Sequence, residues 1–192
     1  MVNTIDLIKE MKDYAEDNNV PIITDEGINY IKENNIKRIL EVGAAIGYSS
    51  ILMALTDDEI TITTIERDEK RYLEAVKNIK KFHLEERITL LYKDAFDVEL
   101  DAEFDLVFID AAKAQNTRFF EKFSKNLAKQ GTIITDNMNF HGLVEDESKI
   151  ESRNLRALIR KVKAYHDYLE NNEDYKTIFL NIGDGLAASK PI

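Results

Sequence analysis

The sequence predicts an α/β fold of the Rossmann-like, doubly wound kind, with a seven-stranded, mostly parallel sheet, a C-terminal antiparallel hairpin and helices on both faces. Three observations predict it. Short apolar runs alternate with helical patterns through residues 38–135, as in parallel strands joined by crossover helices. A glycine turn follows the first apolar run directly. Two strand-like runs around Gly183-Asp184-Gly185 predict the closing hairpin.

Composition bounds the class of protein. The chain has 192 residues, 44% hydrophobic and 32% charged, as in an ordinary globular protein. We expect one domain over 1–192, with N-terminal helices over 1–35 and an α/β core over 36–192. The sequence has no apolar run of the roughly 20 residues that span a membrane, no signal-peptide pattern and no cysteine. These features favour a cytoplasmic protein with no membrane partner.

Two helices are expected before the core. Residues 3–18 have an amphipathic helical pattern that ends before Pro21. Thr24 can cap a second helix over 25–35, whose acidic first turn suits the helix dipole.

The core is expected to alternate strands and helices. We expect strands near 38–42, 60–65, 87–92, 104–109 and 131–135, helices near 49–55, 68–82 and 114–129, and a last helix over 150–171 before the hairpin.

The turn Gly43-x-x-x-Gly47 ends the first strand and allows a ligand to approach the backbone closely. A dinucleotide site would prefer Gly-x-Gly-x-x-Gly, but Ala45 replaces the middle glycine. Glu41 is also a poor neighbour for a pyrophosphate and a better one for an ammonium group, such as that of S-adenosylmethionine. Glu66, at the tip of the second strand, can meet ribose hydroxyls, or it is a solvated acid in a charged run. An NAD-dependent dehydrogenase is therefore the less favoured alternative.

Oxygen side chains follow the fourth and fifth strands. Asp110 follows one, and Asp136 and Asn137 end the other. If these strands are neighbours, the three side chains converge at one sheet edge and suit Mg²⁺, or otherwise Mn²⁺ or Ca²⁺. The alternative is that the acids only cap strand ends. Lys113 lies near Asp110, where a cation would disfavour its charged form, as a general base requires; elsewhere it would be an ordinary surface lysine.

Other polar residues are less specific. Asp94 follows the third strand and could accept the adenine amino group, or it is a turn residue. His83, His141 and His166 have no metal-ligand spacing.

A stripe of basic residues is expected on the helix near 149–163, opposite apolar residues that face the core. Its members recur at spacings of four, three, four and three: Lys149, Arg153, Arg156, Arg160 and Lys163. Because the net charge is −10, this is a local reversal of sign. The stripe would either contact the phosphates of a polynucleotide or be an ordinary solvated face.

Four stretches, 39–49, 108–113, 134–137 and 183–187, resemble the catechol-type, metal-dependent O-methyltransferases, which have the class I S-adenosylmethionine-dependent methyltransferase fold. Residues 20–23, 140–144 and 149–166 are most similar to the bacterial tRNA 5-hydroxyuridine methyltransferases. This resemblance implies methylation of the wobble uridine at its 5-hydroxyl to give 5-methoxyuridine, with tRNA as partner and a homodimer.

The resemblance also implies roles for individual residues. The implied metal ligands are Asp110, Asp136 and Asn137; the implied cofactor contacts are Ile23, Ser49, Glu66, Asp94, Ala95 and Asp110, to which the glycine turn adds Glu41 and Gly43. Lys113 has the position of the catalytic lysine, and Asp110 would be shared by metal and cofactor. Small catechols or phenylpropanoids are the alternative acceptors, and a non-catalytic nucleotide-binding module is the alternative of another class.

Overall fold

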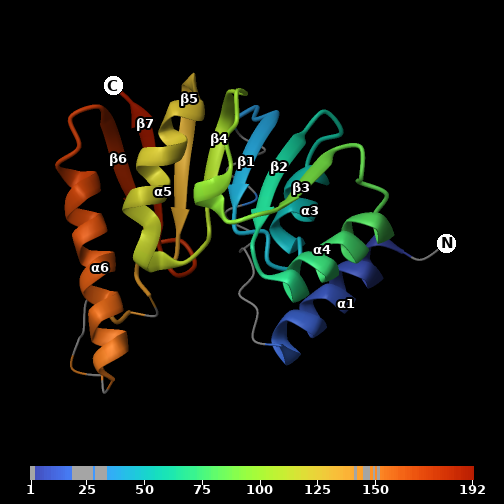
Figure 1. Cartoon of the computed structure of the whole chain (residues 1–192), viewed down its shortest axis with the longest axis horizontal. Helices are drawn as coiled ribbons and strands as arrows, with labels where there is room; N and C mark the ends of the chain where they lie inside the picture. Colours follow the sequence, from blue (N-terminus) through green and yellow to red (C-terminus); the bar gives the residue numbers. More distant parts are fainter. Residues whose placement is uncertain are drawn as a thin grey trace. The chain divides into compact units, whose positions relative to one another are not determined.

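The computed structural model describes residues 3–18, 28, 34–140, 142–144, 148, 150 and 152–192. The chain forms two compact units, Met1–Val98 and Glu99–Ile192 (Figure 1). The expected single domain over 1–192 remains a prediction.

The first unit begins with α1 (Thr4–Asp17), which confirms the helix expected over 3–18. Asn3 caps it, because its side-chain oxygen accepts a hydrogen bond from the Ile5 N–H at 3.2 Å. Most of the second helix expected over 25–35, with its cap Thr24, lies outside the described residues.

A parallel sheet of order β3-β2-β1 forms the centre of the first unit. Its elements are β1 (Arg38–Val42), β2 (Thr61–Glu66) and β3 (Ile88–Tyr92), with α3 (Tyr48–Ala54), α4 (Glu69–Lys81) and the short 3₁₀ helix η1 (Ala95–Asp97). Ile39, Leu40 and Val42 are at most 1% exposed. The strand β1 is thus buried on both faces, as its unbroken apolar run predicted.

The second unit has four strands in the order β4-β5-β7-β6. Its elements are β4 (Phe104–Ile109), η2 (Lys113–Gln115), α5 (Asn116–Phe123), η3 (Ser124–Asn126), β5 (Leu127–Asp136), α6 (Arg153–Glu170), β6 (Tyr175–Leu180) and β7 (Leu186–Pro191). The pair β4–β5 is parallel, whereas β7 is antiparallel to both β5 and β6. The two units therefore contain all the expected strands, including the closing hairpin.

The helix expected over 114–129 is too long. The α-helix ends at Phe123, and β5 already begins at Leu127, which pairs with Phe104. The side chain of Asn126 donates to the carbonyls of Leu100 and Ala102 at 2.7 and 3.1 Å. These bonds tie the chain to the segment before β4 and favour strand pairing over further helix, a tertiary effect that the local pattern does not contain.

Aromatic packing holds α6 to the second unit. The Phe120 ring of α5 meets Tyr165 and Tyr168 of α6 edge-on, with centroids 6.4 and 5.7 Å apart. The Tyr165 hydroxyl also shares a hydrogen bond of 2.8 Å with the Thr135 hydroxyl in β5. The helix α6 is thereby fixed beside the end of β5, where the predicted metal ligands lie. Among the described residues, no helix is long and apolar enough to cross a membrane.

Candidate functional site

The glycine turn of the first unit has the strained backbone expected of a ligand-binding turn. Gly43, Ala45 and Gly47 have φ values of 107°, 46° and 79°. A Cβ on Gly47 would lie 3.4 Å from the Cβ of Ala75 in α4. The turn is therefore packed against α4, and Gly47 supplies the left-handed conformation that the turn requires.

Glu66 is fixed beside this turn by backbone groups. Its carboxylate is 7% exposed and accepts hydrogen bonds from the N–H groups of Ala45, Arg67 and Asp68 at 2.8, 2.9 and 2.8 Å. The charged run around it is exposed, but Glu66 itself is not a solvated acid. Oε1 accepts two of these bonds and Oε2 accepts one, so Oε2 retains a lone pair that could accept a ribose hydroxyl.

Glu41 has a different setting from the one expected. Its side chain is 0% exposed, and its carboxylate accepts hydrogen bonds from the hydroxyls of Ser49, Ser50 and Thr64. The carboxylate thus joins β1, β2 and the start of α3. The structure shows Glu41 bonded to Ser49 and two other hydroxyls, and its contact with an ammonium group stays a prediction. The sequence analysis missed Ser50 and Thr64, since neither lies in a recognisable motif.

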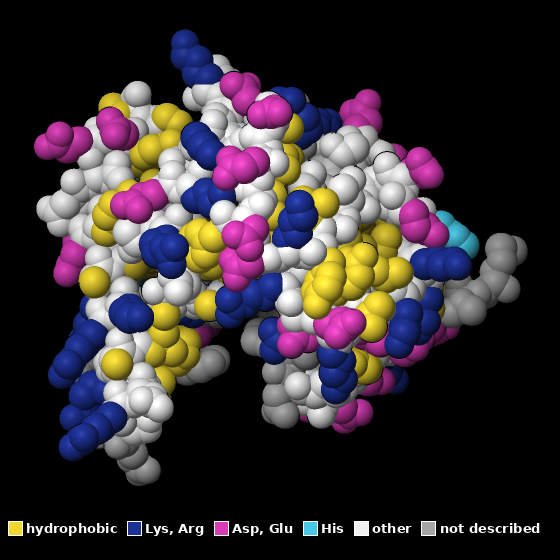
Figure 2. Space-filling model, viewed as in Figure 1, with side chains coloured by type: hydrophobic (Ala, Val, Ile, Leu, Met, Phe, Trp, Pro, Cys, Tyr) yellow, Lys and Arg dark blue, Asp and Glu magenta, His cyan; other side chains and the backbone are white. Residues whose placement is uncertain are grey.

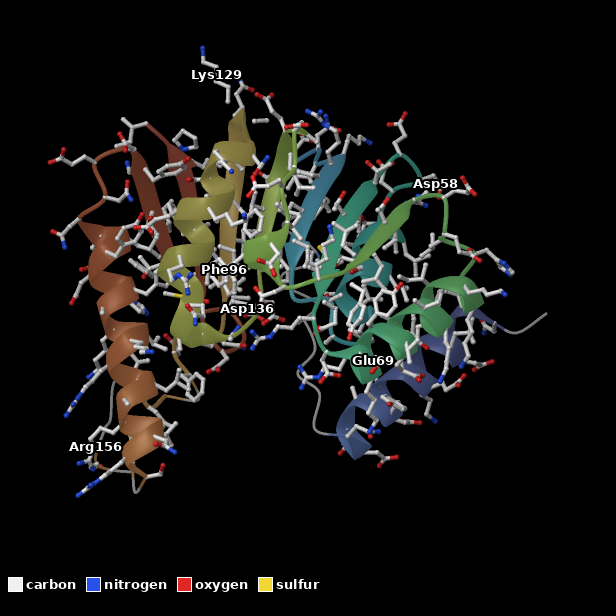
Figure 3. The ribbon with its side chains drawn as sticks, viewed as in Figure 1. Asp58, Glu69, Phe96, Lys129, Asp136 and Arg156 are labelled. Atoms are coloured by element: carbon white, nitrogen blue, oxygen red, sulfur yellow. The ribbon has the colours of Figure 1, made fainter. Side chains whose placement is uncertain are left out.

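The predicted adenine contact, Asp94, caps η1. One carboxylate oxygen accepts from the Phe96 N–H at 3.0 Å, and the other forms an ion pair with Arg67 at 3.1 Å. Ala95, also a predicted cofactor contact, directly follows Asp94 and is 7% exposed. Figure 3 labels the next residue, Phe96, and so shows where η1 lies. Ile23, the remaining predicted cofactor contact, lies outside the described residues.

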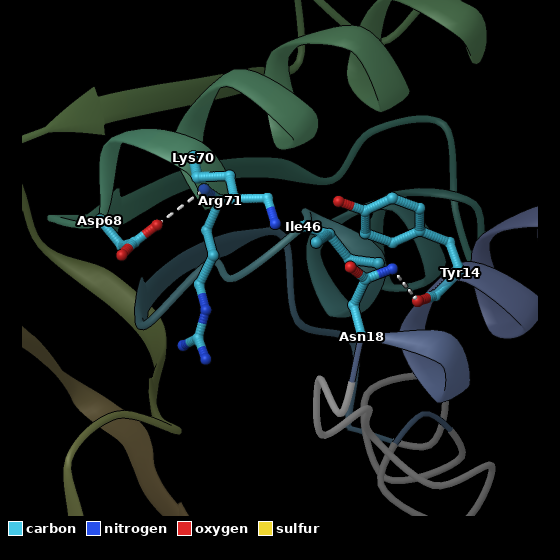
Figure 4. Close-up of a pocket in the computed structure, with 6 residues that line it drawn as sticks. All are labelled: Tyr14, Asn18, Ile46, Asp68, Lys70 and Arg71. Atoms are coloured by element: carbon cyan, nitrogen blue, oxygen red, sulfur yellow. Dashed lines mark hydrogen bonds between the residues drawn. The ribbon is translucent and has the colours of Figure 1, made fainter.

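A pocket of about 170 Å³ lies beside the glycine turn in the first unit (Figure 4). It is lined by Tyr14, Asn18, Ile46, Asp68, Lys70 and Arg71. Only Ile46 belongs to the turn, and none of the lining residues is a predicted cofactor contact. The pocket is therefore not the cofactor site that the sequence predicts.

In the second unit, Asp110 and Lys113 are brought together as expected. The Lys113 Nζ lies 2.7 Å from the Asp110 Oδ1, and the two side chains are 11% and 14% exposed. Lys113 begins η2, directly after the loop that follows β4. A lysine paired in this way is not the ordinary surface residue of the alternative interpretation.

The carboxylate of Asp136 interacts electrostatically with Asp110 and Lys113. Burial, followed by the negative charge of Asp110, raises the pKa of Asp136 to about 6; Lys113 and the Asn137 N–H oppose this shift, and Asp184 adds to it. The Asn137 N–H donates to Asp136 Oδ1 at 2.7 Å. Asp184 was missed from the sequence, where it is only the middle of a hairpin turn. Figure 3 labels Asp136.

This cluster fits a hard divalent cation. Two carboxylates and an amide offer oxygen ligands, and a cation would offset the repulsion that raises the pKa of Asp136. Within the described part of the chain, no three His, Cys, Asp or Glu side chains are grouped as a metal cage by themselves. The predicted set differs from such a cage because Asn137 is its third member.

The hairpin turn holds the segment that carries Asn137. The N–H groups of Met138 and Asn139 donate to the carbonyls of Gly185 and Asp184 at 2.9 and 2.8 Å. A Cβ on Gly185 would lie only 2.7–2.9 Å from atoms of Asn139, and φ at Gly185 is 85°. Only glycine fits there, so the Gly-Asp-Gly sequence serves the packing of the two turns as well as the hairpin.

The described part of the basic stripe is exposed on α6. Arg153, Arg156 and Arg160 are exposed and Lys163 is half-buried, whereas Val162, on the opposite face, is 1% exposed. Lys149 lies outside the described residues. Lys and Arg side chains gather at the lower left of Figure 2, where α6 lies in Figure 1. The helix packs against η2, the segment of Lys113.

A glycine turn with an acid at the tip of the next strand, and acids at the ends of β4 and β5, are features of a Rossmann-like α/β protein. The chain belongs to the O-methyltransferase family, whose model matches residues 7–192.

Individual relatives agree with the family. The chain is 29% identical over 188 residues to the caffeoyl-CoA O-methyltransferase of Populus kitakamiensis, covering 91% of this chain and 80% of that protein. It is 35% identical over 123 residues to the catechol O-methyltransferase of Niastella koreensis, covering 60% of this chain and 55% of that protein.

Solved structures agree on the fold. A Staphylococcus aureus protein, proposed to be a caffeoyl-CoA O-methyltransferase, matches with a TM-score of 0.90 and 41% identity over 96% of this chain and 92% of that one. A Bacillus cereus O-methyltransferase in complex with S-adenosylhomocysteine matches with a TM-score of 0.82 and 22% identity, over 100% of this chain and 93% of that one. The Rossmann-like, seven-stranded fold class predicted from the sequence is confirmed.

Proposed function

We propose that the protein is an S-adenosylmethionine- and Mg²⁺-dependent O-methyltransferase whose acceptor is a hydroxyl beside a second oxygen, as in small catechol or phenylpropanoid compounds. The observation that carries this proposal is the cluster of Asp110, Lys113 and Asp136 in a chain of the O-methyltransferase family. The names of the relatives, caffeoyl-CoA and catechol O-methyltransferases, support this acceptor class.

The first unit would bind the cofactor. The relative from Bacillus cereus holds S-adenosylhomocysteine, the product of S-adenosylmethionine after methyl transfer. In this chain, Glu66 would accept a ribose hydroxyl at Oε2, because three backbone N–H groups already hold its carboxylate in place. Glu41 would keep Ser49 in position for the cofactor through the hydrogen bond between them.

The second unit would prepare the acceptor. Asp110, Asp136 and Asn137 would hold Mg²⁺, which supplies Lewis-acid stabilisation of an oxygen anion. A phenol-like hydroxyl has a pKa of about 10, so that stabilisation is needed for a nucleophile near neutral pH. Lys113 must be neutral to take this proton at its Nζ, and a cation bound beside it would favour that neutral form. Its ion pair with Asp110 places it beside the acid that would be a metal ligand.

A second acceptor, tRNA with 5-hydroxyuridine at the wobble position, is favoured by one specific observation. The basic stripe of α6 is exposed, and α6 packs against the η2 segment of Lys113. A polyanion bound along α6 would therefore lie on the same unit as the proposed catalytic cluster. A homodimer and a cytoplasmic location remain predictions.

The deciding experiment follows methyl transfer from labelled S-adenosylmethionine with Mg²⁺, to a catechol and, separately, to tRNA containing 5-hydroxyuridine. We expect label in at least one acceptor and its loss with EDTA. If only catechol is labelled, the acceptor is a small molecule and the basic stripe of α6 is an ordinary solvated surface. If only tRNA is labelled, the protein is a tRNA 5-hydroxyuridine methyltransferase. No transfer to either acceptor, with cofactor bound, would contradict the proposed function.

Neutralising the stripe separates the two acceptors further. If tRNA is the acceptor, the triple change Arg153→Gln, Arg156→Gln and Arg160→Gln should raise the KM for tRNA by about tenfold or more, since each arginine can contact a phosphate. Transfer to catechol should be unchanged. The matched control neutralises three other exposed cations of the same unit, Lys129, Lys176 and Lys190. Equal loss in both triple variants would contradict a specific role for α6.

A further inference from the structure

Asn137 sits in a backbone conformation that needs support. Its φ is 57°, in the left-handed region, where residues with a Cβ are uncommon although Asn is enriched among them. Such a conformation persists where neighbouring groups hold it. The groups that hold this segment therefore decide where the Asn137 amide lies.

Two consecutive residues of α6 contact both sides of this segment. On one side, the Tyr165 hydroxyl shares a hydrogen bond of 2.8 Å with Thr135. On the other side, His166 Nε2 lies 3.0 Å from the Met138 carbonyl. Asp136 and Asn137 are the two residues between these attachment points. Burial also raises the pKa of the Tyr165 hydroxyl, so that it remains a neutral hydrogen-bonding group.

The contact made by His166 is directional. A carbonyl oxygen only accepts hydrogen bonds, so Nε2 carries the proton and donates. The imidazole ring is stacked on Phe179 of β6, with ring centroids 4.6 Å apart and an interplanar angle of 11°. The ring orientation is thus set independently of the bond that it makes.

The Met138 peptide groups are held from two directions. Its N–H donates to Gly185 in the hairpin turn at 2.9 Å, and its carbonyl accepts from His166. The N–H belongs to the peptide that follows Asn137, so rotation about the Asn137 backbone would break this bond. Met138 itself is 1% exposed. Removing His166 would leave the Met138 carbonyl without this donor, while the N–H groups of Met138 and Asn139 would keep their bonds to the hairpin turn.

We propose that His166 is a positioning residue for the metal site: it holds the Met138 carbonyl and thereby keeps Asn137 in the conformation that ligates the cation. It does not touch the cation itself. This inference rests on the metal site of the proposed function, and it assigns a role to a histidine that has no metal-ligand spacing in the sequence.

The test measures Mn²⁺ binding to the whole chain by calorimetry, without cofactor or acceptor. His166→Ala should weaken Mn²⁺ binding by about 10–100-fold, the usual effect of losing a partner that orients a ligand. His166→Gln places an amide N–H near the original Nε2 position and should bind within a few-fold of wild type. His166→Asn carries the same amide on a shorter side chain that cannot reach Met138, and should resemble alanine. His83→Asn, at an exposed histidine with φ of 57°, is the control and should bind as wild type.

The outcomes distinguish the positioning role of His166 from the metal site of the proposed function. Wild-type affinity in a folded His166→Ala variant would overturn the positioning role. If His166→Ala does not fold, the pair of amide variants decides, since equal affinity in His166→Gln and His166→Asn would also overturn it. No Mn²⁺ binding by the wild-type chain would instead contradict the metal site of the proposed function, and the positioning role with it.

Discussion

Asp110→Ala should reduce methyl transfer at least about a thousandfold, corresponding to roughly 4 kcal/mol of transition-state stabilisation. The change removes one of the two carboxylates proposed to hold the cation. It also leaves Lys113, 11% exposed and now 2.7 Å from an Asp110 oxygen, without its ion-pair partner. The measurement is the rate of label transfer at saturating Mg²⁺ and cofactor, with the fold checked by circular dichroism.

The control for this variant is Asp101→Ala, which removes an exposed carboxylate just before β4. It should leave the rate unchanged. Near-normal activity of Asp110→Ala would contradict the proposed mechanism, because no other carboxylate of that loop could replace Asp110.

Asp136→Asn should stabilise the metal-free protein at alkaline pH. The pKa of Asp136 is raised from 3.8 to about 6 in the folded state, mainly by burial and by Asp110. The folded protein therefore binds this proton more tightly than the unfolded chain does, so the free energy of unfolding falls as pH rises from about 4 through 6. A shift of about two units corresponds to about 3 kcal/mol. Asparagine removes this penalty and can still accept from the Asn137 N–H.

Thermal unfolding in EDTA at pH 5 and pH 8 checks this prediction. The variant should melt several degrees above wild type at pH 8, with a smaller difference at pH 5. Adding Mg²⁺ at pH 8 should raise the melting temperature of wild type but not that of the variant, because the variant lacks a ligand charge. An exposed change, Asp101→Asn, should show neither effect. If the variant is less stable than wild type at pH 8 in EDTA, the ionised Asp136 carboxylate does not destabilise the folded protein, which contradicts its raised pKa.

Much of the fold could be predicted because its local patterns agree with the final structure. The run around Ile39 and Leu40 is apolar without interruption, as a strand buried on both faces requires, and β1 occupies it. The periodicity of α6 places Arg160 and Val162 on opposite sides, and the helix buries the side of Val162 as expected. The end of α5 could not be predicted, because Asn126 stops the helix through bonds to Leu100 and Ala102, about 25 residues away in the chain.

The residues of the candidate site also fall into two groups, those that the sequence predicted and those that it did not. Asp110, Asp136 and Lys113 were recognisable because parallel strands end at a common edge, so that position along each strand already implies proximity. Glu66 was recognisable for a similar reason, at the tip of β2. Roles that depend on packing between distant segments were not recognisable, and Asp184 and His166 are the main examples.

The sequence by itself determined the fold class, the family resemblance and the residue types of the proposed catalytic cluster, because these follow from local periodicity and short motifs. Only the tertiary structure decided that Glu41 is buried beneath three hydroxyls, that Asp184 lies in the field of Asp136, and that His166 holds Met138. The physical reason is that burial and hydrogen bonding depend on which segments meet in space, and a single sequence contains that information only for neighbouring residues.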